Sequence, residues 1–72
     1  MTVNISFNLN EICRLYKINY ADLSRRSGID RAYLYNIQRR QSVSLKNLGR
    51  IAAALKIENP TELLTIEIEK RN

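Results

Sequence analysis

Histidine is absent from the 72-residue sequence, and cysteine occurs only once. Without histidine the chain lacks the commonest zinc ligand and the commonest general acid/base, and one cysteine cannot form an intrachain disulfide. Glycine occurs only twice, so a glycine-rich phosphate-binding loop is missing too. The sequence therefore predicts a protein that is not an enzyme, with no catalytic residues, no metal site and no cofactor. Cys13 is expected to be a small buried apolar residue.

Long apolar runs are missing as well. No stretch approaches the roughly 18 consecutive apolar residues that a membrane-spanning helix needs. The N-terminal segment MTVNISFN has neither the basic start nor the apolar block of a signal peptide. A chain of 72 residues is long enough for one small domain. We therefore expect a single domain over residues 1–72, located in the cytoplasm, without a membrane partner.

Basic residues outnumber acidic ones by 12 to 7, which gives a net charge of +5. Their distribution is uneven, because residues 24–50 contain seven basic residues and only one acid, Asp30, for a local charge of +6. The basic residues are Arg25, Arg26, Arg31, Arg39, Arg40, Lys46 and Arg50. Such a surface favours an acidic partner, either nucleic acid or an acidic protein face. A solvated basic face without a partner is the alternative.

Five polar residues have the sequence context of a helix N-cap: Asn8, Asn19, Asp30, Ser44 and Asn59. Each of the first four is preceded by an apolar residue and followed by another four positions later. At this spacing the two apolar side chains pack across the start of a helix. Asn59 is followed by Pro60, and proline is favoured at the first helical position. The pattern predicts five short helices with tight corners between them.

Apolar residues recur at helical spacing after the first and fourth of these helix starts. The inner face of the first helix is predicted to consist of Leu9, Ile12, Cys13 and Tyr16. The inner face of the fourth helix is predicted to consist of Leu45, Leu48, Ile51, Ala52 and Leu55. Together these two faces indicate the core of an all-helical domain.

The two ends of the chain have a different period. Residues 3–7 and 64–68 both alternate apolar and polar side chains, which is the period of a strand. One interpretation pairs these segments into a short two-stranded ribbon that joins the termini. The other continues the last helix through Glu67 and Lys70, because an isolated ribbon is only marginally stable.

The middle of the sequence predicts a helix-turn-helix over about residues 20–38. Its two helices, about Tyr20 to Ser27 and Arg31 to Gln38, are separated by a very short turn. Gly28 can adopt the left-handed conformation that ends the first helix, and Asp30 is placed to cap the second. The two helices must therefore cross at a large angle, which is typical of this motif.

Several apolar and turn residues carry a resemblance to a known family. They are Leu23, Gly28, Ile29, Leu34 and Ile37, followed after a loop by the segment LKNLGRIAAALKI. Over about Leu9 to Leu64 the chain resembles the Cro/repressor-type helix-turn-helix domains of temperate-phage and bacterial regulators. The resemblance implies an all-α domain of five helices whose third helix lies in the major groove of double-stranded DNA. It also implies a role in a phage or mobile-element switch, inside the bacterial host cell.

Carried over by position, the resemblance implies two groups of contacts. Those that face base edges or a partner are Arg31, Ala32 and Asn36, with Tyr33 and Tyr35 beside them. Those that face phosphates or an acidic surface are Tyr20, Arg25, Arg39, Arg40 and Lys46. The chemistry of the first group agrees, because arginine pairs with guanine and asparagine with adenine through two hydrogen bonds each. Tyr33 is also consistent with packing against the core.

This sequence departs from the family pattern at four of these or neighbouring positions. Tyr20 stands where the family usually has a phosphate-binding glutamine, and Ser24 where it has alanine. Gln38 and Arg40 stand where it usually has glutamate and then glycine at the end of the third helix.

Tyrosine supports a second interpretation. Tyr20, Tyr33 and Tyr35 lie on or near the predicted DNA-contacting face, and tyrosine and arginine are enriched at the hot spots of protein interfaces. The alternative function is therefore an antirepressor that binds the DNA-binding domain of a phage repressor and blocks its operator contacts. Operator binding predicts a dimer, since operators have two half-sites, whereas an antirepressor could act as a monomer in a heterocomplex.

Overall fold

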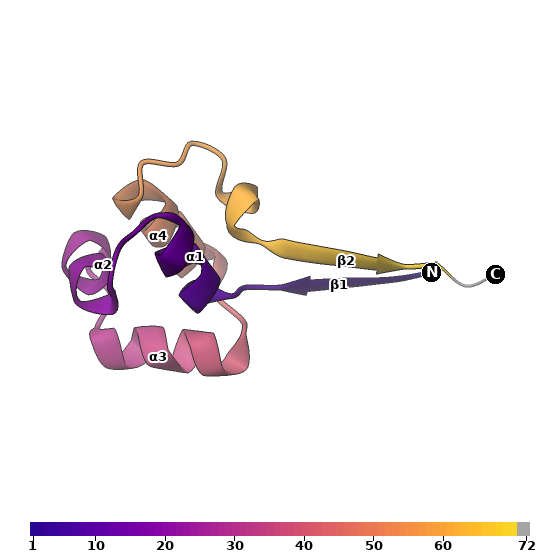
Figure 1. The fold of residues 1–72 in the computed structure, drawn as a ribbon, viewed down its shortest axis with the longest axis horizontal. Coiled ribbons are helices and arrows are strands. Elements are labelled where there is room, and N and C mark those ends of the chain that lie inside the picture. Colours follow the sequence, from indigo (N-terminus) through magenta and orange to yellow (C-terminus); the bar gives the residue numbers. More distant parts are fainter. Residues whose placement is uncertain (71–72) are drawn as a thin grey trace.

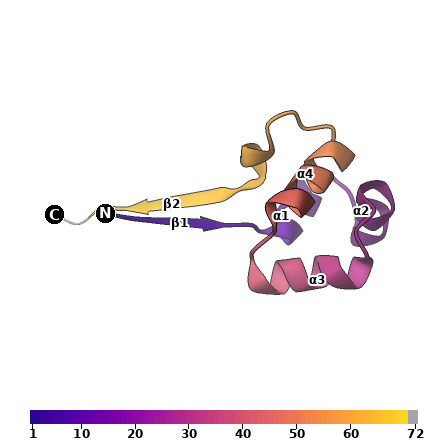
Figure 2. The same cartoon turned by 180° about the vertical axis from the view of Figure 1, so that it is seen from behind.

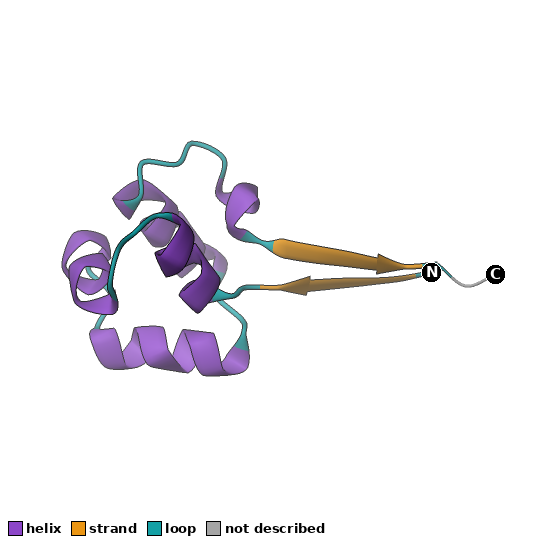
Figure 3. Ribbon diagram, in the orientation of Figure 1, coloured by secondary structure: helices purple, strands orange, loops and turns teal. Residues whose placement is uncertain are grey.

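The computed structural model describes residues 1–70, so the last two residues of the predicted 1–72 domain lie outside the described part of the chain. Four α-helices, a 3-10 helix and a two-stranded sheet follow one another (Figures 1 and 3). In chain order they are β1 (Thr2–Ser6), α1 (Leu9–Leu15), α2 (Tyr20–Ser27), α3 (Arg31–Arg40), α4 (Leu45–Ala54), η1 (Pro60–Leu63) and β2 (Thr65–Glu69).

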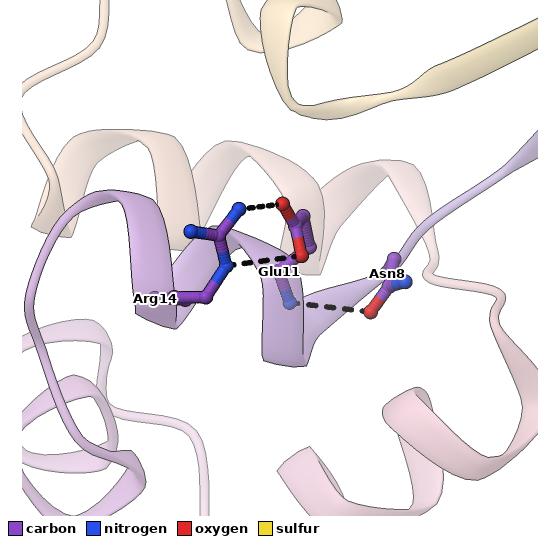
Figure 4. Close-up of polar contacts among 3 residues, drawn as sticks. All are labelled: Asn8, Glu11 and Arg14. Carbon is purple, nitrogen blue, oxygen red and sulfur yellow. Dashed lines mark hydrogen bonds and ion pairs between the residues drawn. The ribbon is translucent and has the colours of Figure 1, made fainter.

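Side-chain caps begin four of the five helical elements. The side-chain oxygens of Asn8, Asn19 and Ser44 each accept a hydrogen bond from the backbone N–H three residues later, and that of Asn59 accepts one from two residues later. Figure 4 shows the first of these caps, in which Asn8 Oδ1 lies 3.2 Å from the backbone nitrogen of Glu11. These four predicted helix starts are confirmed, since each satisfies an amide that the helix itself leaves without a partner.

Figure 4 also shows an ion pair that follows the first cap. The guanidinium of Arg14 donates to the carboxylate of Glu11, and this hydrogen bond lowers the pKa of Glu11 below its ordinary value. Both side chains are exposed, and an exposed pair three residues apart on a helix contributes little to stability.

Asp30 is the exception among the predicted caps, because its side chain makes no cap hydrogen bond. It does occupy the position before α3, and its backbone carbonyl accepts from the N–H groups of Tyr33 and Leu34. The residues on either side of this start, Ile29 and Leu34, are both buried. Packing of this apolar pair therefore fixes the start of α3 without help from the carboxylate.

The core consists of twelve buried apolar residues that come from all four α-helices, the turn between α2 and α3, the link between β1 and α1, and η1. They are Phe7, Leu9, Ile12, Cys13, Leu23, Ile29, Leu34, Ile37, Leu48, Ile51, Ala52 and Leu63. Cys13 is buried as predicted, and its burial raises the pKa of the thiol. None of the twelve is polar or charged, so hydrophobic burial is the main force that holds the helices together.

Two residues that the sequence assigns to the core are exposed. Tyr16 is 42% exposed because it lies just beyond α1, which ends at Leu15. The residue after Tyr16, Lys17, turns the chain with a φ of 53°. Leu45 is 86% exposed. It is the first residue of α4 and lies at the edge of the apolar stripe, whose centre is formed by Leu48 and Ile51. No other element covers it.

The prediction of five α-helices is wrong in its last member. The segment after Asn59 forms only the four-residue 3-10 helix η1, whose buried residue is Leu63. At Leu64 the backbone becomes extended, with φ −92° and ψ 145°. The alternating segment that follows then pairs with the N-terminal strand, and this pairing prevents a longer helix.

The ribbon interpretation of the chain ends is confirmed, and the extension of the last helix through Glu67 and Lys70 is wrong. Strand β1 pairs antiparallel with β2, with Val3 opposite Ile68 and Ile5 opposite Ile66. The fold is therefore mostly helical with a small sheet, and not all-α. Figures 1 and 2, which view the molecule from opposite sides, both show the ribbon projecting away from the four α-helices.

Candidate nucleic-acid interface

The turn between α2 and α3 is fixed by three hydrogen bonds. Gly28 adopts the left-handed conformation (φ 75°) and donates its N–H to the carbonyl of Ser24 over 2.9 Å. The Ser24 hydroxyl donates to the carbonyl of Ile29 over 2.5 Å, and the Ile29 N–H donates to the Ser27 hydroxyl over 3.2 Å. Ser24, which stands where the family resembled by the sequence usually has alanine, thus supplies a hydrogen bond across the turn. The three hydrogen bonds together hold α2 and α3 at an angle to each other.

Helix α3 buries one side and exposes the other. It begins and ends at Arg31 and Arg40, two residues beyond the predicted end, with Leu34 and Ile37 buried and Gln38 half-buried. The remaining residues form what we call the outer face of α3: Arg31, Ala32, Tyr33, Tyr35, Asn36, Arg39 and Arg40. All five residues expected to contact bases or a partner lie on it. Tyr33 is 46% exposed, so it does not pack into the core.

Within the outer face, the helical period separates three rows. Ala32, Asn36 and Arg39 point directly away from the core, opposite Leu34 and Ile37. Arg31 and Tyr35 flank this row on one side, and Tyr33 and Arg40 flank it on the other. The structure thereby brings the predicted contact residues onto one continuous surface about three turns long.

Asn36 and Arg39 are joined by a hydrogen bond. The Arg39 guanidinium donates to Asn36 Oδ1 over 2.8 Å. This bond occupies one lone pair of the amide oxygen and leaves the amide N–H groups to donate elsewhere. The two side chains therefore act as a pair, although the sequence assigned one to bases and the other to phosphate.

On one flank, Tyr20 links α2 to α3 and α1. The centroid of its ring lies 4.7 Å from the centroid of the Tyr35 ring, and the two ring planes are inclined by 34°. Its hydroxyl donates to Asn10 Oδ1 over 2.5 Å, and the Asn10 backbone N–H donates to Gln38 Oε1 over 2.7 Å. Because the hydroxyl proton of Tyr20 is already used, Tyr20 could donate to a phosphate only if its bond to Asn10 opened.

Burial raises the pKa of Tyr20 to about 12, with smaller contributions from nearby Cys13 and Tyr35. The phenol is consequently neutral at physiological pH, and it keeps the proton that it shares with Asn10. No local signal in the sequence indicates the hydrogen bond between Asn10 and Gln38, since the two residues lie 28 positions apart in the chain.

On the opposite flank, a groove runs between α3 and the loop that leads to α4. It has a volume of about 360 Å³ and is lined by Tyr33, Asn36 and Arg40 from α3 and by residues 42–44 from the loop. An aromatic ring, an amide and a guanidinium thus meet at one concave site beside the central row. Such a site offers donors to a phosphate and an apolar wall to a sugar or a partner side chain.

The basic residues around α3 differ in how far they are neutralised. Arg25 forms an ion pair with Asp22 over 2.9 Å on the exposed side of α2. Within residues 1–70, Arg31, Arg39, Arg40 and Lys46 have no carboxylate within 4.0 Å. Their positive charge is therefore fully available to an anionic partner, and that of Arg25 is partly cancelled.

Two further properties concern residues 1–70 only. None of their helices is both long enough and apolar enough to cross a membrane. They also contain no group of three cysteine, aspartate or glutamate side chains placed to hold a metal ion.

Comparison with known protein families identifies the domain. A family model described as a Cro/C1-type HTH DNA-binding domain matches residues 8–69, which include the four α-helices, η1 and all of β2. The comparisons with curated proteins and with solved structures found no match.

Proposed function

Because the chain belongs to the Cro/C1-type helix-turn-helix DNA-binding domain family and is thus a DNA-binding regulator of transcription, we propose that it binds operator DNA through the outer face of α3. The observation that carries the proposal is the composition of this helix. It has three arginines, one asparagine and no acidic residue, and its exposed side is continuous. An α-helix of this size fits the major groove of B-DNA.

The central row and Arg31 contact bases in this proposal. Arg31 is at the start of α3, where its guanidinium can donate to O6 and N7 of guanine. Asn36 donates its amide N–H to adenine N7, and its Oδ1, shared with Arg39, accepts from adenine N6. Ala32 lies next to Asn36 in the same row and suits contact with a thymine methyl group.

The surrounding residues contact the backbone of the DNA. Arg39, Arg40 and Lys46 carry unpaired charge and lie at the C-terminal end of α3 and the start of α4. Tyr20 and Arg25 contribute less, because each already has a partner within the protein. Phosphate contacts of this kind supply affinity that falls steeply with salt and carry no sequence information.

The regulator acts, in this proposal, in a genetic switch of a phage or related mobile element, whose regulators the sequence resembles. Binding to such an operator would place two copies on two half-sites about 34 Å apart.

A second function is favoured by the tyrosines. Tyr35 is 58% exposed and Tyr33 is 46% exposed, which is a large aromatic area for a surface that contacts only DNA. Exposed tyrosines beside arginines and a groove also suit a protein interface. In this version the outer face of α3 binds the DNA-binding domain of a phage repressor and displaces it from its operator.

A titration separates the two functions. Labelled DNA from the promoter region next to the gene is titrated with the protein, alone and with the neighbouring repressor, at low and moderate salt. Operator binding predicts a sequence-selective complex with the protein alone, weakened by roughly 1–3 kcal/mol in Arg31→Ala. Arg26→Ala is the matched control, because Arg26 lines a cavity between α1, α2 and the end of α4 and lies off the outer face of α3.

The other outcomes are equally informative. If the protein alone gives no selective complex but releases the repressor from its operator, the antirepressor function replaces operator binding. If Arg26→Ala weakens the DNA complex as much as Arg31→Ala, the net charge of the protein determines binding, and α3 has no special role.

A further inference from the structure

The ends of α1 and α4 have the same local structure and meet at one cavity. Each helix is followed by a lysine in the left-handed conformation, Lys17 with a φ of 53° and Lys56 with a φ of 59°. One residue later, the N–H of Ile18 or Ile57 donates back to a carbonyl five positions earlier, which closes the helix end. A cavity of about 330 Å³ lies between these two ends and α2, and both lysines line it. We call this cavity the α1–α4 end site.

The backbone at the two lysines would suit glycine better than lysine. A residue that follows a helix in the left-handed conformation is most often glycine, because a side chain there crowds the backbone. Among residues 1–70, three residues other than glycine have a positive φ: Lys17, Lys56 and Gln41. Two of the three thus place a charged side chain at this one site. Backbone strain of this kind is concentrated at functional sites, so we looked for what the two side chains could bind.

The α1–α4 end site is positively charged. Arg26 of α2 lines it together with Lys17 and Lys56, and in the described part of the chain no carboxylate lies within 4.0 Å of their side-chain nitrogens. Asp22 lines it too, but its carboxylate is paired with Arg25 over 2.9 Å. The C-terminal end of a helix contributes only about half a negative charge. The three cations therefore outweigh the two helix ends by roughly two positive charges, and the site attracts an anionic group.

The wall of the same cavity also contains apolar groups. Tyr16 is 42% exposed, and Ile18 and Leu55 are half-buried. Leu15, the residue before Tyr16, is 61% exposed. Aromatic and aliphatic side chains beside basic ones are typical of the surfaces by which proteins bind other proteins. The residues at this site therefore match a partner that is both acidic and apolar.

We propose that the α1–α4 end site binds an acidic segment of a protein partner, one that carries a leucine or an aromatic residue between its carboxylates. The carboxylates pair with Lys17, Arg26 and Lys56. The apolar side chain enters the hollow between Tyr16 and Leu55, which both line the cavity. Nucleic acid fits this site less well, because its backbone has no apolar side chain to fill the hollow.

The site lies on the opposite side of the helical part from α3. In Figures 1 and 2, α3 runs along the lower side of the helical part, and the end of α4 lies on its upper side. None of the residues that line the site belongs to the outer face of α3. A partner bound there leaves α3 accessible, so the chain could hold this partner and DNA at the same time. Because binding at the site does not depend on DNA binding, either proposal can fail without the other.

Selection of peptides from a random display library tests the proposal, with a variant that removes charge and retains the fold. Lys17→Asn with Lys56→Asn removes two positive charges, and asparagine tolerates the left-handed backbone. The library is first depleted on this variant, which keeps the outer face of α3, and the remaining peptides are selected on the unmodified protein. We expect enriched peptides in which aspartates or glutamates surround a leucine or an aromatic residue.

Fluorescence anisotropy with a selected peptide then compares three variants. Arg50→Gln with Lys70→Gln is the matched control, because it removes the same charge at residues that do not line the site. We expect binding at least about ten-fold weaker in Lys17→Asn with Lys56→Asn, about five-fold weaker in Tyr16→Ala, and changed less than about two-fold in the control. Amide NMR shifts of the complex should move at the ends of α1 and α4 and not in α3. Circular dichroism confirms that each variant is folded.

Three results would overturn the proposal. The first is a selection that leaves no peptide after depletion, or only peptides without acidic residues. The second is an equal loss of peptide binding in the charge-matched control, which would mean that net charge determines binding. The third concerns a scrambled DNA duplex: if Lys17→Asn with Lys56→Asn weakens its binding far more than the control does, the site belongs to nucleic acid.

Discussion

The outer face of α3 and the apolar ribbon face, formed by Val3, Ile5, Ile66 and Ile68, are both exposed, and they lie on parts of the molecule with opposite character. The first belongs to the helical part, where twelve buried residues hold the elements together, and it carries arginine, asparagine and tyrosine. The second belongs to a projection in which every residue of the strands except Ser6 is exposed, and it carries only valine and isoleucine.

The exposed side chains of the two regions differ in how favourably they interact with water. Charged and amide side chains on a well-packed helix are stable in water and are also ready for an anionic partner. Aliphatic side chains on a two-stranded ribbon are unfavourable in water and need a cover. The two surfaces belong to separate parts of the molecule, so substitutions in one should leave the other unchanged.

The largest expected effect separates the two regions by their stability. Leu34 is fully buried, so Leu34→Ala should lower the free energy of unfolding by roughly 2–5 kcal/mol. Ile66 is 55% exposed and packs mainly against its cross-strand neighbour, so Ile66→Ala should cost less than about 1 kcal/mol. Urea unfolding at low protein concentration, followed by helical circular dichroism, measures both. Equal losses would mean that ribbon and helices unfold as one unit.

The next effect concerns DNA binding by the Asn36–Arg39 pair. Because their side chains are hydrogen-bonded, Asn36→Ala and Arg39→Ala should not be additive, with a coupling energy of roughly 0.5–3 kcal/mol in binding to a specific duplex. A double-mutant cycle by fluorescence anisotropy measures it. Additive losses would show that the two side chains act separately.

A smaller effect is expected at the Tyr20 link. The pKa of Tyr20 rises from its ordinary value of 10.0 to about 12 in the folded protein, so the fold favours the neutral phenol. Its contribution to stability is fully present below about pH 10, where unfolded tyrosine ionises, and is lost as the pH rises towards 12. Tyr20→Phe should remove the part of the tyrosinate absorbance titration with a midpoint near 12. A titration identical to that of the unmodified protein would contradict this.

The smallest effect contrasts charges on the two surfaces. Lys46→Ala should weaken binding to all DNA sequences alike and reduce the slope of log affinity against log salt by about 0.9, the value for one phosphate contact. Glu69→Gln on the ribbon should leave that slope unchanged. Anisotropy titrations at four salt concentrations measure both slopes. A larger change in Glu69→Gln would place the ribbon at the DNA.

Much of the fold could be predicted because its signals are local. Caps at Asn8, Asn19, Ser44 and Asn59 depend on residues two or three positions away, so the sequence places those helix starts correctly. Predictions failed where a local pattern meets a chain end or a competing partner. Tyr16 keeps the helical spacing, but its helix has already ended at Leu15. The fifth helix is replaced by strand pairing between residues far apart in the chain, such as Val3 and Ile68.

The candidate interface shows the same limit. The position of Arg31, Asn36 and Arg39 on one surface follows from helical periodicity alone. The Asn10 link to Gln38 and Tyr20 could not be predicted, because it depends on how α1 packs across α3. Likewise, alternation in β1 and β2 indicates an apolar face, but only the three-dimensional arrangement shows that the helices leave it uncovered.

In the proposed function, the outer face of α3 recognises a specific DNA sequence. The most direct measurement is selection of duplexes from a random pool by the purified protein, followed by affinities for the selected duplex and a scrambled one at two salt concentrations. Sequence-specific binding through α3 predicts one enriched motif, bound at least about a thousand-fold more tightly than the scrambled duplex, with the preference reduced in Arg31→Ala. No enriched motif, and equal salt-dependent affinity for both duplexes, would contradict it.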